Sequence, residues 1–262
     1  ILPALSDDEL STEFAAAIRA LIDGSAGSTS CLAQVALPAA TAATTDLSGS
    51  PPPAKLTAPV DQPRPRLLRI GTRGSILARR QAAMAVAALT AHGIATEVIE
   101  ITTRGDLDQR TPLDAFEGDG VFTDELEVAV AAGSIDLAVH SLKDLPLRES
   151  PFTTIGAVLS RGSADEALVA REGATLAELP SGARIGTSSV RRAAQVRLLR
   201  PDLELVPLRG PVDARLDAVA RGELDGAILA VAGLKRLGAL ERISERFPIG
   251  CFVPEAGQGA IA

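Results

Sequence analysis

The chain is poor in aromatic residues: among its 262 residues are six Phe, no Trp and no Tyr. Proteins that bind single-stranded nucleic acid use aromatic side chains as stacking platforms, so this class of function is disfavoured. The formal net charge of −7 also argues against non-specific binding to DNA or to anionic membranes. The two cysteines, Cys31 and Cys251, are too few for a disulfide framework or a cysteine-based metal site.

Long hydrophobic runs are absent as well. No stretch approaches the length of a transmembrane helix, and no basic segment followed by an apolar one opens the chain. We therefore expect a soluble protein in the reducing cytoplasm. The sequence does not begin with Met and stops at "GQGAIA" without a visible closing element, so we expect it to be a fragment.

The first part of the chain, residues 1–65, differs in composition from the rest. Residues 6–23 have apolar residues at helical spacing and begin with a Ser6–Glu9 capping box, which predicts one amphipathic helix. Residues 38–66 are rich in Ala, Thr and Ser and contain seven prolines, which is typical of a semi-extended linker. We interpret 1–65 as one helix followed by a spacer.

From Leu67 onward, strand-like runs alternate with helical periods. "RLLRIG", "ATEVIEIT", "IDLAVH", "ARIGTSS", "LELVPL" and "LDGAILAV" are the strand-like runs, and "VRRAAQVRLL" is one of the helical ones. This alternation predicts a mainly parallel sheet covered on both faces. It occurs twice, so we predict an α/β fold of two domains, residues 66–160 with 254–262 and residues 161–253. Ligands bind such folds at the carboxyl ends of strands, which predicts a cleft between the domains.

Hydroxyl groups and arginines follow several of the predicted strands. They are Arg73 and Ser75 in "GTRGS", Thr187, Ser188, Ser189, Arg191 and Arg192 in "GTSSVRR", and later Arg209, Arg215 and Arg236. Taken alone, a helix cap at Ser189 and a solvated face of arginines is the favoured interpretation. Repetition at successive element ends instead favours an anion site, because helix N-termini and arginines both bind anions. A polycarboxylate fits better than a phosphate, since no phosphate-binding loop and no acidic pair for magnesium are present.

The stretch "IDLAVHSLKDLP" (135–146) places an acid beside a cation where a predicted strand ends. Asp144 can exchange protons there or stabilise a cationic intermediate, and its structural alternative is a cap before Pro146. Asp106 in "TTRGD" is a second, weaker candidate, more typical of a loop-forming aspartate. His92 and His140 have no partner ligands in the pattern, so we predict no metal site. No Ser-His-Asp set and no dinucleotide fingerprint occur.

The order and spacing of several motifs resemble the hydroxymethylbilane synthase (porphobilinogen deaminase) family from about Leu67 to Ala262. The motifs are "RIGTRGSILARRQA", "ITTRGD", "VHSLKDLP", "IGTSSVRRAAQ", "LRG", "AILAVAGLKRLG" and "GQGAIA". The resemblance implies two domains like type II periplasmic binding proteins around a cleft. It also implies a third domain, whose cysteine holds a dipyrromethane cofactor by a thioether. The activity it implies is a transferase of tetrapyrrole (heme) biosynthesis that joins four porphobilinogen molecules with loss of ammonia.

The resemblance also assigns roles to single residues. Asp144 would be the catalytic acid that stabilises the positive charge as ammonia leaves. The cofactor would be held by Ser141, Lys143, Thr187, Ser188, Ser189, Arg191, Arg192 and Arg215. The substrate would be held by Arg73, Ser75, Gln81, Arg209, Arg236 and Gln258. We expect porphobilinogen as the small-molecule partner, no nucleic-acid or membrane partner, and a monomer.

The sequence departs from the family pattern at several places. Asp119 and Asp124 stand where many relatives have lysines, Pro211 replaces an asparagine, and the usual Arg-Glu-Asp-Pro-Arg-Asp-Ala is reduced to "SRGSADEA". We expect the third domain of the family to be missing from this chain, and neither cysteine lies in the attachment motif. We expect Cys251 to be buried and inert in its apolar run, and Cys31 to lie too far away across the linker.

We therefore expect the chain by itself to be inactive. An alternative from another functional class is a non-catalytic module that binds a small polycarboxylate. That module would explain the arginines but not Asp144, because a fixed acid repels a polyanion. A weaker alternative is an anion-sensing regulatory domain.

Overall fold

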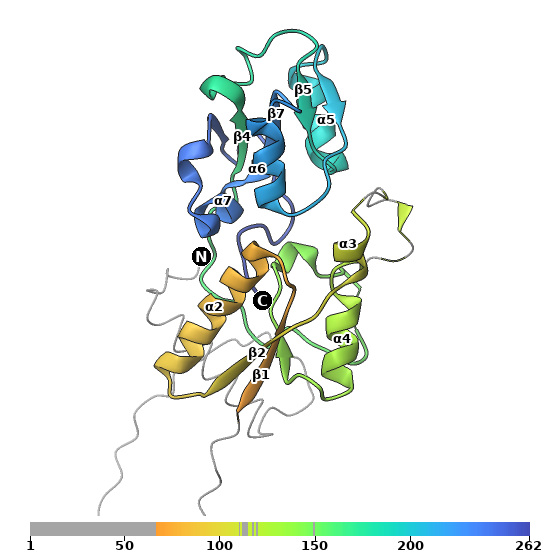
Figure 1. Cartoon of the computed structure of the whole chain (residues 1–262), viewed down its shortest axis with the longest axis vertical. Coiled ribbons are helices and arrows are strands. Elements are labelled where there is room, and N and C mark those ends of the chain that lie inside the picture. The colour runs from red at the N-terminus through yellow and green to blue at the C-terminus, as the bar shows by residue number, and fades with distance from the viewer. Residues whose placement is uncertain (1–66, 110, 112–114, 117, 119, 149) are drawn as a thin grey trace, which may run out of the picture.

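The computed structural model describes residues 67–109, 111, 115–116, 118, 120–148 and 150–262 (Figure 1). The helix predicted over 6–23, the linker, Cys31 and Asp119 lie outside these residues. The chain forms two sheets. We call the first sheet with its helices the first lobe and the second sheet with its helices the second lobe.

The first lobe holds a three-stranded parallel sheet in the order β2-β1-β3. Its elements are β1 (Leu68–Thr72), α2 (Ile76–Ala91), β2 (Thr96–Glu100), α3 (Arg104–Leu107), α4 (Asp124–Ala131), β3 (Leu137–Ala138) and the 3₁₀ turn η2 (Leu142–Asp144). Helices α2 and α4 lie on opposite sides of the sheet (Figure 1). The parallel sheet predicted here is confirmed, although β3 is much shorter than the run "IDLAVH".

The second lobe holds a five-stranded sheet in the order β6-β5-β7-β4-β8. Its strands are β4 (Glu166–Ala170), β5 (Arg184–Gly186), β6 (Glu204–Val206), β7 (Gly226–Ala230) and β8 (Glu245–Phe247). Its helical elements are η3 (Arg171–Gly173), α5 (Val190–Leu199), α6 (Val212–Ala220), α7 (Val231–Leu237) and η4 (Leu240–Arg242). Strand β5 pairs in parallel with β6 and β7, whereas β4 runs antiparallel to β7 and β8, so this sheet is mixed.

Alternation along β4 and β7 builds a core on each face of the second sheet. Ala167 and Leu229 pack in a cluster with Leu216 and Val219 of α6, whereas Leu168 packs on the other face in a cluster that contains Val196 of α5. Successive side chains of a strand point to opposite faces, so a strand covered on both sides must be apolar throughout. This explains why "EALVA" and "GAILA" show no polar alternation.

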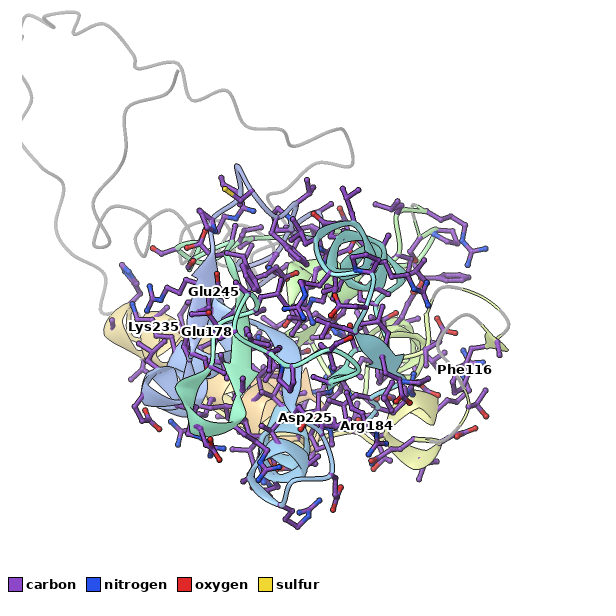
Figure 2. The ribbon with its side chains drawn as sticks, turned by 90° about the horizontal axis from the view of Figure 1, so that it is seen from above. Phe116, Glu178, Arg184, Asp225, Lys235 and Glu245 are labelled. Atoms are coloured by element: carbon purple, nitrogen blue, oxygen red, sulfur yellow. The ribbon has the colours of Figure 1, made fainter. Side chains whose placement is uncertain are left out.

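Polar contacts outside the core also fix the strands. Arg184 at the start of β5 lies beside Asp225 (Figure 2), and the Arg184 amide donates to the Asp225 carboxylate at 2.8 Å.

In the first lobe, Ile261 near the end of the described chain packs with Leu68 and Leu89 in one apolar cluster. The C-terminal segment therefore returns to the first lobe, as expected, while the domain limits at 160 and 253 stay a prediction.

Two segments, one around Gly162 and one around Gly259, cross between the lobes and contact each other. The Gly162 amide donates to the Gly259 carbonyl at 2.9 Å. Gly259 has a φ of 90°, and a Cβ there would lie 2.4 Å from the Gly162 carbonyl oxygen, so only glycine fits. The C-terminus lies in the first lobe, beside α2 in Figure 1, and the Ala262 amide donates to the His140 carbonyl at 2.9 Å. Of the helices in the described part of the chain, none is long and apolar enough to cross a membrane.

Candidate active site

A cleft of about 750 Å³ is lined by residues of both lobes. Its volume falls within the range of about 300–1,000 Å³ that is typical of small-molecule sites. The first lobe contributes Arg73, Ser75, Asp106, Phe122, Ser141, Lys143 and Asp144. The second lobe contributes Ser188, Ser189, Arg191, Arg192, Arg209 and Arg215, and the crossing segment contributes Glu255. Five of the predicted arginines, Arg73, Arg191, Arg192, Arg209 and Arg215, therefore line one cleft with Asp144, whereas Arg236 does not line it.

The stretch "HSLKD" (140–144) contains the 3₁₀ turn η2, which hydrogen-bonds to residues near Ala262. The Leu142 amide donates to the Ala260 carbonyl at 3.1 Å, and Ser141 forms an isolated bridge with Ile261. The Asp144 amide closes the turn onto the Ser141 carbonyl. Asp144 thus ends a 3₁₀ turn and does not cap a helix, which excludes the structural alternative considered for it.

The Asp144 carboxylate lines the cleft without an ion pair or hydrogen bond to any residue of the described ranges. Its charge nevertheless affects the groups around it. Burial lowers the pKa of His140 to about 4, and the charge of Asp144 opposes that shift. Burial also lowers the pKa of Arg215 to about 10. The charges of Arg192 and Arg209 add to this lowering, whereas the charge of Asp144 raises the pKa. The Asp144 carboxylate is therefore open to contact with a ligand, and His140 and Arg215 are among the groups that its charge affects.

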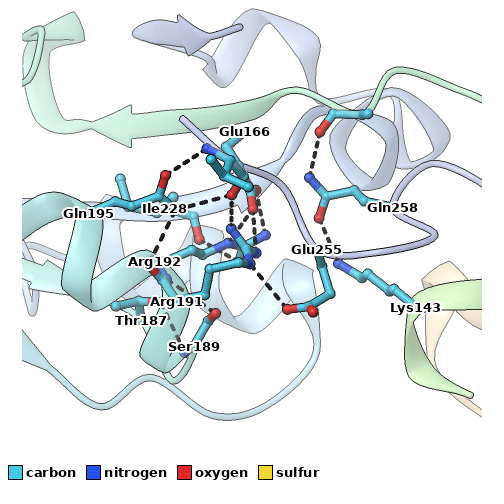
Figure 3. Close-up of polar contacts among 12 residues, drawn as sticks. Lys143, Glu166, Thr187, Ser189, Arg191, Arg192, Gln195, Ile228, Glu255 and Gln258 are labelled. Carbon is cyan, nitrogen blue, oxygen red and sulfur yellow. Dashed lines mark hydrogen bonds and ion pairs between the residues drawn. The ribbon is translucent and has the colours of Figure 1, made fainter. Parts of the chain in front are cut away.

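Lys143 lies beside Asp144 and reaches the crossing segment. Its Nζ donates to Gln258 Oε1 at 3.3 Å, and Gln258 Nε2 donates to the Ala164 carbonyl at 2.8 Å (Figure 3). Burial lowers the pKa of Lys143, and the charge of Arg192 lowers it further. The charges of Asp144 and Glu166 act in the other direction and raise it. Gln258, which is fully buried, thus connects Lys143 of the first lobe to the segment that precedes β4.

The "SSVRR" arginines bind an internal acid, Glu166, at the start of β4 (Figure 3). Arg192 Nη2 and Nε lie 2.6 and 2.9 Å from the two Glu166 oxygens, and Arg191 Nη2 lies 2.8 Å from Oε1. Burial would raise the pKa of Glu166, but the charges and hydrogen bonds of Arg192 and Arg191 outweigh it, so the pKa is lowered. Arg192 is itself buried and also donates to the Ile228 carbonyl at 2.9 Å.

This ion pair changes the physical picture of the two arginines. The sequence suggested that both face ligand carboxylates, whereas Arg192 has an internal carboxylate partner. Its role toward a cofactor stays a prediction. Sequence reasoning missed Glu166, although an acid that opens an otherwise apolar strand is a signal for a buried counter-ion.

Arg73 is fixed from two sides in the first lobe. Its Nε lies 3.2 Å from each carboxylate oxygen of Asp106, and its guanidinium lies 4.1 Å from the ring centre of Phe122. Burial would raise the pKa of Asp106, but the hydrogen bond and charge of Arg73 outweigh it, and the pKa is lowered. Asp106 also accepts a hydrogen bond from the Thr103 hydroxyl at 2.8 Å. Asp106 therefore orients Arg73, and Phe122 is a cleft residue that sequence reasoning missed.

Arg209 reaches from the second lobe to the first. Its Nη2 donates to the Asp108 carbonyl at 3.0 Å, while its buried Nη1 has no hydrogen-bond acceptor in the described part of the chain. The guanidinium lies 5.5 Å from the Phe116 ring centre. Arg215 donates from Nε to the Gly210 carbonyl at 2.8 Å. A buried donor without an acceptor costs free energy, so an anion in the cleft would find a ready partner at Arg209.

Three predicted residues lie behind the main cleft, around a smaller cavity of about 70 Å³ between α2 and α7. Gln81 donates to the Ser141 hydroxyl at 2.7 Å, Arg236 donates to the Gly259 carbonyl at 2.5 Å, and Gln258 bonds as described above. Ser141, Lys143, Arg192 and Arg215 line both cavities. Gln81, Arg236 and Gln258 therefore support the cleft wall from behind.

The predicted hydroxyl groups mostly hold the backbone. Ser75 and Ser189 accept hydrogen bonds from the Ala78 and Arg192 amides and cap α2 and α5. Ser188 accepts from the Leu208 amide at 3.0 Å. Thr187 is buried, accepts from the Ser189 amide at 3.2 Å, and is not among the described residues that line the cleft. The cap interpretation is thus confirmed for Ser189, and the cofactor roles of these hydroxyls stay predictions.

Cys251 corrects one expectation: it is exposed, not buried. Its amide donates to the Pro248 carbonyl at 2.9 Å in a turn, and the neighbouring Phe252 occupies the core position and stacks on Phe247 at 5.1 Å. The apolar run therefore buries Phe252 and turns the cysteine outward. Cys251 does not line the cleft. Within the described residues, no group of three or more His, Cys, Asp or Glu could hold a metal ion.

Asp124 and Pro211, two of the substituted positions of the family pattern, lie within the described residues. Asp124 begins α4 and forms an ion pair with Arg104, so its charge is partly compensated. Pro211 precedes α6 and lines the cleft without a side-chain donor. His92 ends α2 as its C-cap, as its sequence position indicated.

Residues 68–262 match the family model described as "Porphobilinogen deaminase, dipyromethane cofactor binding domain". The porphobilinogen deaminase of Roseiflexus sp. (strain RS-1) is 53% identical over 196 residues, which cover 74% of this chain and 65% of that protein. The one from Mycobacterium bovis (strain BCG / Pasteur 1173P2) is 48% identical and covers 75% and 63%. The chain thus spans just under two thirds of the length of these curated relatives.

Solved structures give weaker likenesses. A periplasmic substrate-binding protein of an ABC transporter from Coxiella burnetii superposes with a TM-score of 0.43 and 16% identity, covering 75% of this chain and 84% of that one. The ligand-binding component of an ABC-type import system from Staphylococcus aureus gives a TM-score of 0.43 and 11% identity, covering 75% and 65%. At these values they add nothing to the topology described above.

Proposed function

The chain belongs to the porphobilinogen deaminase family, and from this premise we propose that it forms the catalytic cleft of a hydroxymethylbilane synthase. The protein would be a transferase of tetrapyrrole biosynthesis, acting in the cytoplasm as a monomer. It would condense porphobilinogen, a pyrrole that carries carboxylates and an aminomethyl group, into hydroxymethylbilane with loss of ammonia.

The observation that carries the proposal is the unengaged Asp144 carboxylate inside a cleft lined by Lys143, Arg191, Arg209 and Arg215. The cations suit the substrate carboxylates, because guanidinium groups bind carboxylates with fixed geometry. An acid among them opposes the binding of a polyanion, so its presence needs a different explanation. A positive charge that develops on the substrate supplies one. This is the reason for preferring an enzyme to a non-catalytic polycarboxylate-binding module.

The chemistry places a clear demand on Asp144. When the bond from the aminomethyl carbon to the nitrogen of its protonated amino group breaks, ammonia leaves with the bonding electrons and the positive charge passes from the ammonium group to the pyrrole. A fixed carboxylate next to the ring stabilises the charge on the ring more than it stabilises the charge on the ammonium group, which lowers the barrier. We assign this role to Asp144. Lys143, held by Gln258, and Arg73, held by Asp106, would orient the substrate carboxylates.

The cleft also suits the carboxylates of a dipyrromethane cofactor. The unsatisfied Arg209 Nη1 and the half-buried Lys143 and Arg215, which line the cleft, offer donors to anions. Ser141, Lys143, Ser188, Ser189, Arg191 and Arg215 would hold those carboxylates. When bound, the group serves as the primer to which the substrate is added. Cys251, the cysteine within the described residues, is exposed away from the cleft, so these residues hold the carboxylates and do not supply the thioether.

The test is porphobilinogen consumption with identification of the product. The protein expressed from its complete coding sequence should consume porphobilinogen and release hydroxymethylbilane, and the 262-residue chain should bind porphobilinogen reversibly. Intact-protein mass spectrometry of the chain after incubation with porphobilinogen or hydroxymethylbilane should show no covalent adduct. A stable two-pyrrole adduct, lost in Cys31→Ser, would make the N-terminal segment a cofactor carrier and overturn this reading of the chain.

A further inference from the structure

Arg191 at the cleft wall divides its guanidinium among three acceptors (Figure 3). Nη2 lies 2.8 Å from Glu166 Oε1, Nε lies 3.1 Å from Glu255 Oε2, and Nη1 donates to the Val253 carbonyl. Two of these acceptors, Val253 and Glu255, belong to the segment that crosses back to the first lobe. Each of the three guanidinium nitrogens therefore has an acceptor within the protein before any ligand is present, and two of the five N–H groups have none among these contacts.

The two carboxylates on Arg191 differ in how firmly they are held. Glu166 is fully buried and both of its oxygens accept from Arg192, so removing it would leave the buried Arg192 without a counter-ion. The side chain of Glu255 is 47% exposed, and within the part of the chain that the structure describes it makes a single ion pair, with Arg191. An exposed pair of this kind contributes little and exchanges readily with solvent or other anions. Glu255 is thus the replaceable partner.

Glu255 also faces the space that a ligand would enter. Glu255 and Arg191 both line the cleft, with Asp106 and Asp144 as its other acidic lining residues in the described ranges. Asp106 is committed to Arg73, and Asp144 makes no ion pair with the described residues. A ligand carboxylate that reaches Arg191 Nε meets Glu255 already in that place and is repelled by its charge.

We propose that Glu255 is an internal competitor that occupies the carboxylate position on Arg191 until a ligand carboxylate displaces it. The residue would set the affinity and the selectivity of the cleft. A ligand with several carboxylates, held by other cations as well, can displace Glu255, whereas a simple monocarboxylate cannot. The inference rests on the proposed function to the extent that it takes the ligand to be a carboxylate.

The test compares Glu255→Gln with a matched control, Glu223→Gln. Glu223 is an exposed glutamate paired with Arg221, at 2.6 Å, on the second lobe, and its replacement changes the net charge by the same amount. The complete chain and both variants are titrated with porphobilinogen and with tricarballylate, a tricarboxylate without a pyrrole, by isothermal calorimetry at low salt. Glu255→Ala serves as a second variant, and thermal unfolding confirms that each variant folds.

We expect Glu255→Gln and Glu255→Ala to bind both probes about two- to fivefold more tightly than the parent, as the loss of one exposed competing pair allows. Glu223→Gln should bind like the parent. The gain should shrink at high salt, since screening weakens the competition and the repulsion together.

The outcomes separate this inference from the proposed function. Equal or weaker binding of both probes by the Glu255 variants overturns the inference, even if the parent binds porphobilinogen. Tighter binding of tricarballylate by the variants, with no binding of porphobilinogen to any form, supports the inference and contradicts the proposed function. Absence of binding of both probes to every form contradicts both.

Discussion

Replacement of Glu166 by glutamine tests the buried ion pair that organises the second lobe. Glu166 has no solvent exposure, and its two oxygens receive Arg192 Nη2 and Nε and Arg191 Nη2 at 2.6–2.9 Å. The Arg192 side chain is 7% exposed and therefore cannot turn to water for a new partner. Glu166→Gln keeps the shape of the side chain and removes its charge, so Arg192 becomes a buried cation without a counter-ion.

The magnitude follows from the burial of both groups. Removing one partner of a buried ion pair costs about 3–5 kcal/mol of unfolding free energy. For a unit of about 150–250 residues, each kcal/mol corresponds to about 2–4 °C in Tm, so Tm should fall by about 6–20 °C. Urea unfolding followed by circular dichroism measures the free energy, and a thermal scan measures Tm. Replacing both partners, in Glu166→Gln with Arg192→Met, should recover part of the loss, because no unpaired charge remains.

The pH dependence gives a second readout. The pKa of Glu166 is lowered in the folded protein, so its contribution to stability is complete above its unfolded pKa of 4.5 and is lost as pH falls through the lower, folded pKa. Glu166→Gln should therefore weaken the acid-induced loss of stability. A Tm within about 2 °C of the parent at neutral pH, together with an unchanged acid profile, would refute the reasoning.

Two further predictions test local structure. Gly259→Ala should destabilise the protein by about 1–3 kcal/mol in urea unfolding, because its φ is 90° and its Cβ would meet the Gly162 carbonyl. The control Gly250→Ala, which has open space around its Cβ, should change the stability little. Equal effects of the two substitutions would contradict the crossing geometry. In a Cys31→Ser background, Cys251 should react with a maleimide in the native state as fast as in urea, because it is exposed. Native-state protection would show that it is buried after all.

The sequence pattern located those features whose signal is local. The run "VRRAAQVRLL" is helix α5, Val190–Leu199, with Ser189 as its cap. Arg73, Asp144, Arg191 and Arg209 end up around one cleft, since parallel strands bring their carboxyl ends to the same edge. Periodicity alone did not show the direction in which strands pair, so the antiparallel pairing of β4 with β7 and β8 was not foreseen.

The residues that sequence reasoning missed depend on partners far along the chain. Glu166 contacts Arg191 and Arg192 over a separation of about 25 residues, and Glu255 contacts Arg191 over 64. The apolar run after Glu166 indicates a buried acid, but no local window identifies the arginines that pair with it or distinguishes Glu255 from an ordinary surface charge. Cys251 was misjudged because the burial of an apolar run was assigned to all its members, whereas the turn after Pro248 buries Phe252 and exposes its neighbour.

The turnover of Asp144→Asn tests the central claim most directly, with Asp217→Asn, on the exposed side of α6, as the matched control. Both variants are made in the protein expressed from its complete coding sequence, and porphobilinogen consumption, porphobilinogen affinity and Tm are measured for each. The account predicts that Asp144→Asn keeps its Tm and its affinity but loses about 10²–10³ in rate, because a carboxylate aimed at developing positive charge is gone. A rate within a few-fold of the parent and of Asp217→Asn would contradict the account.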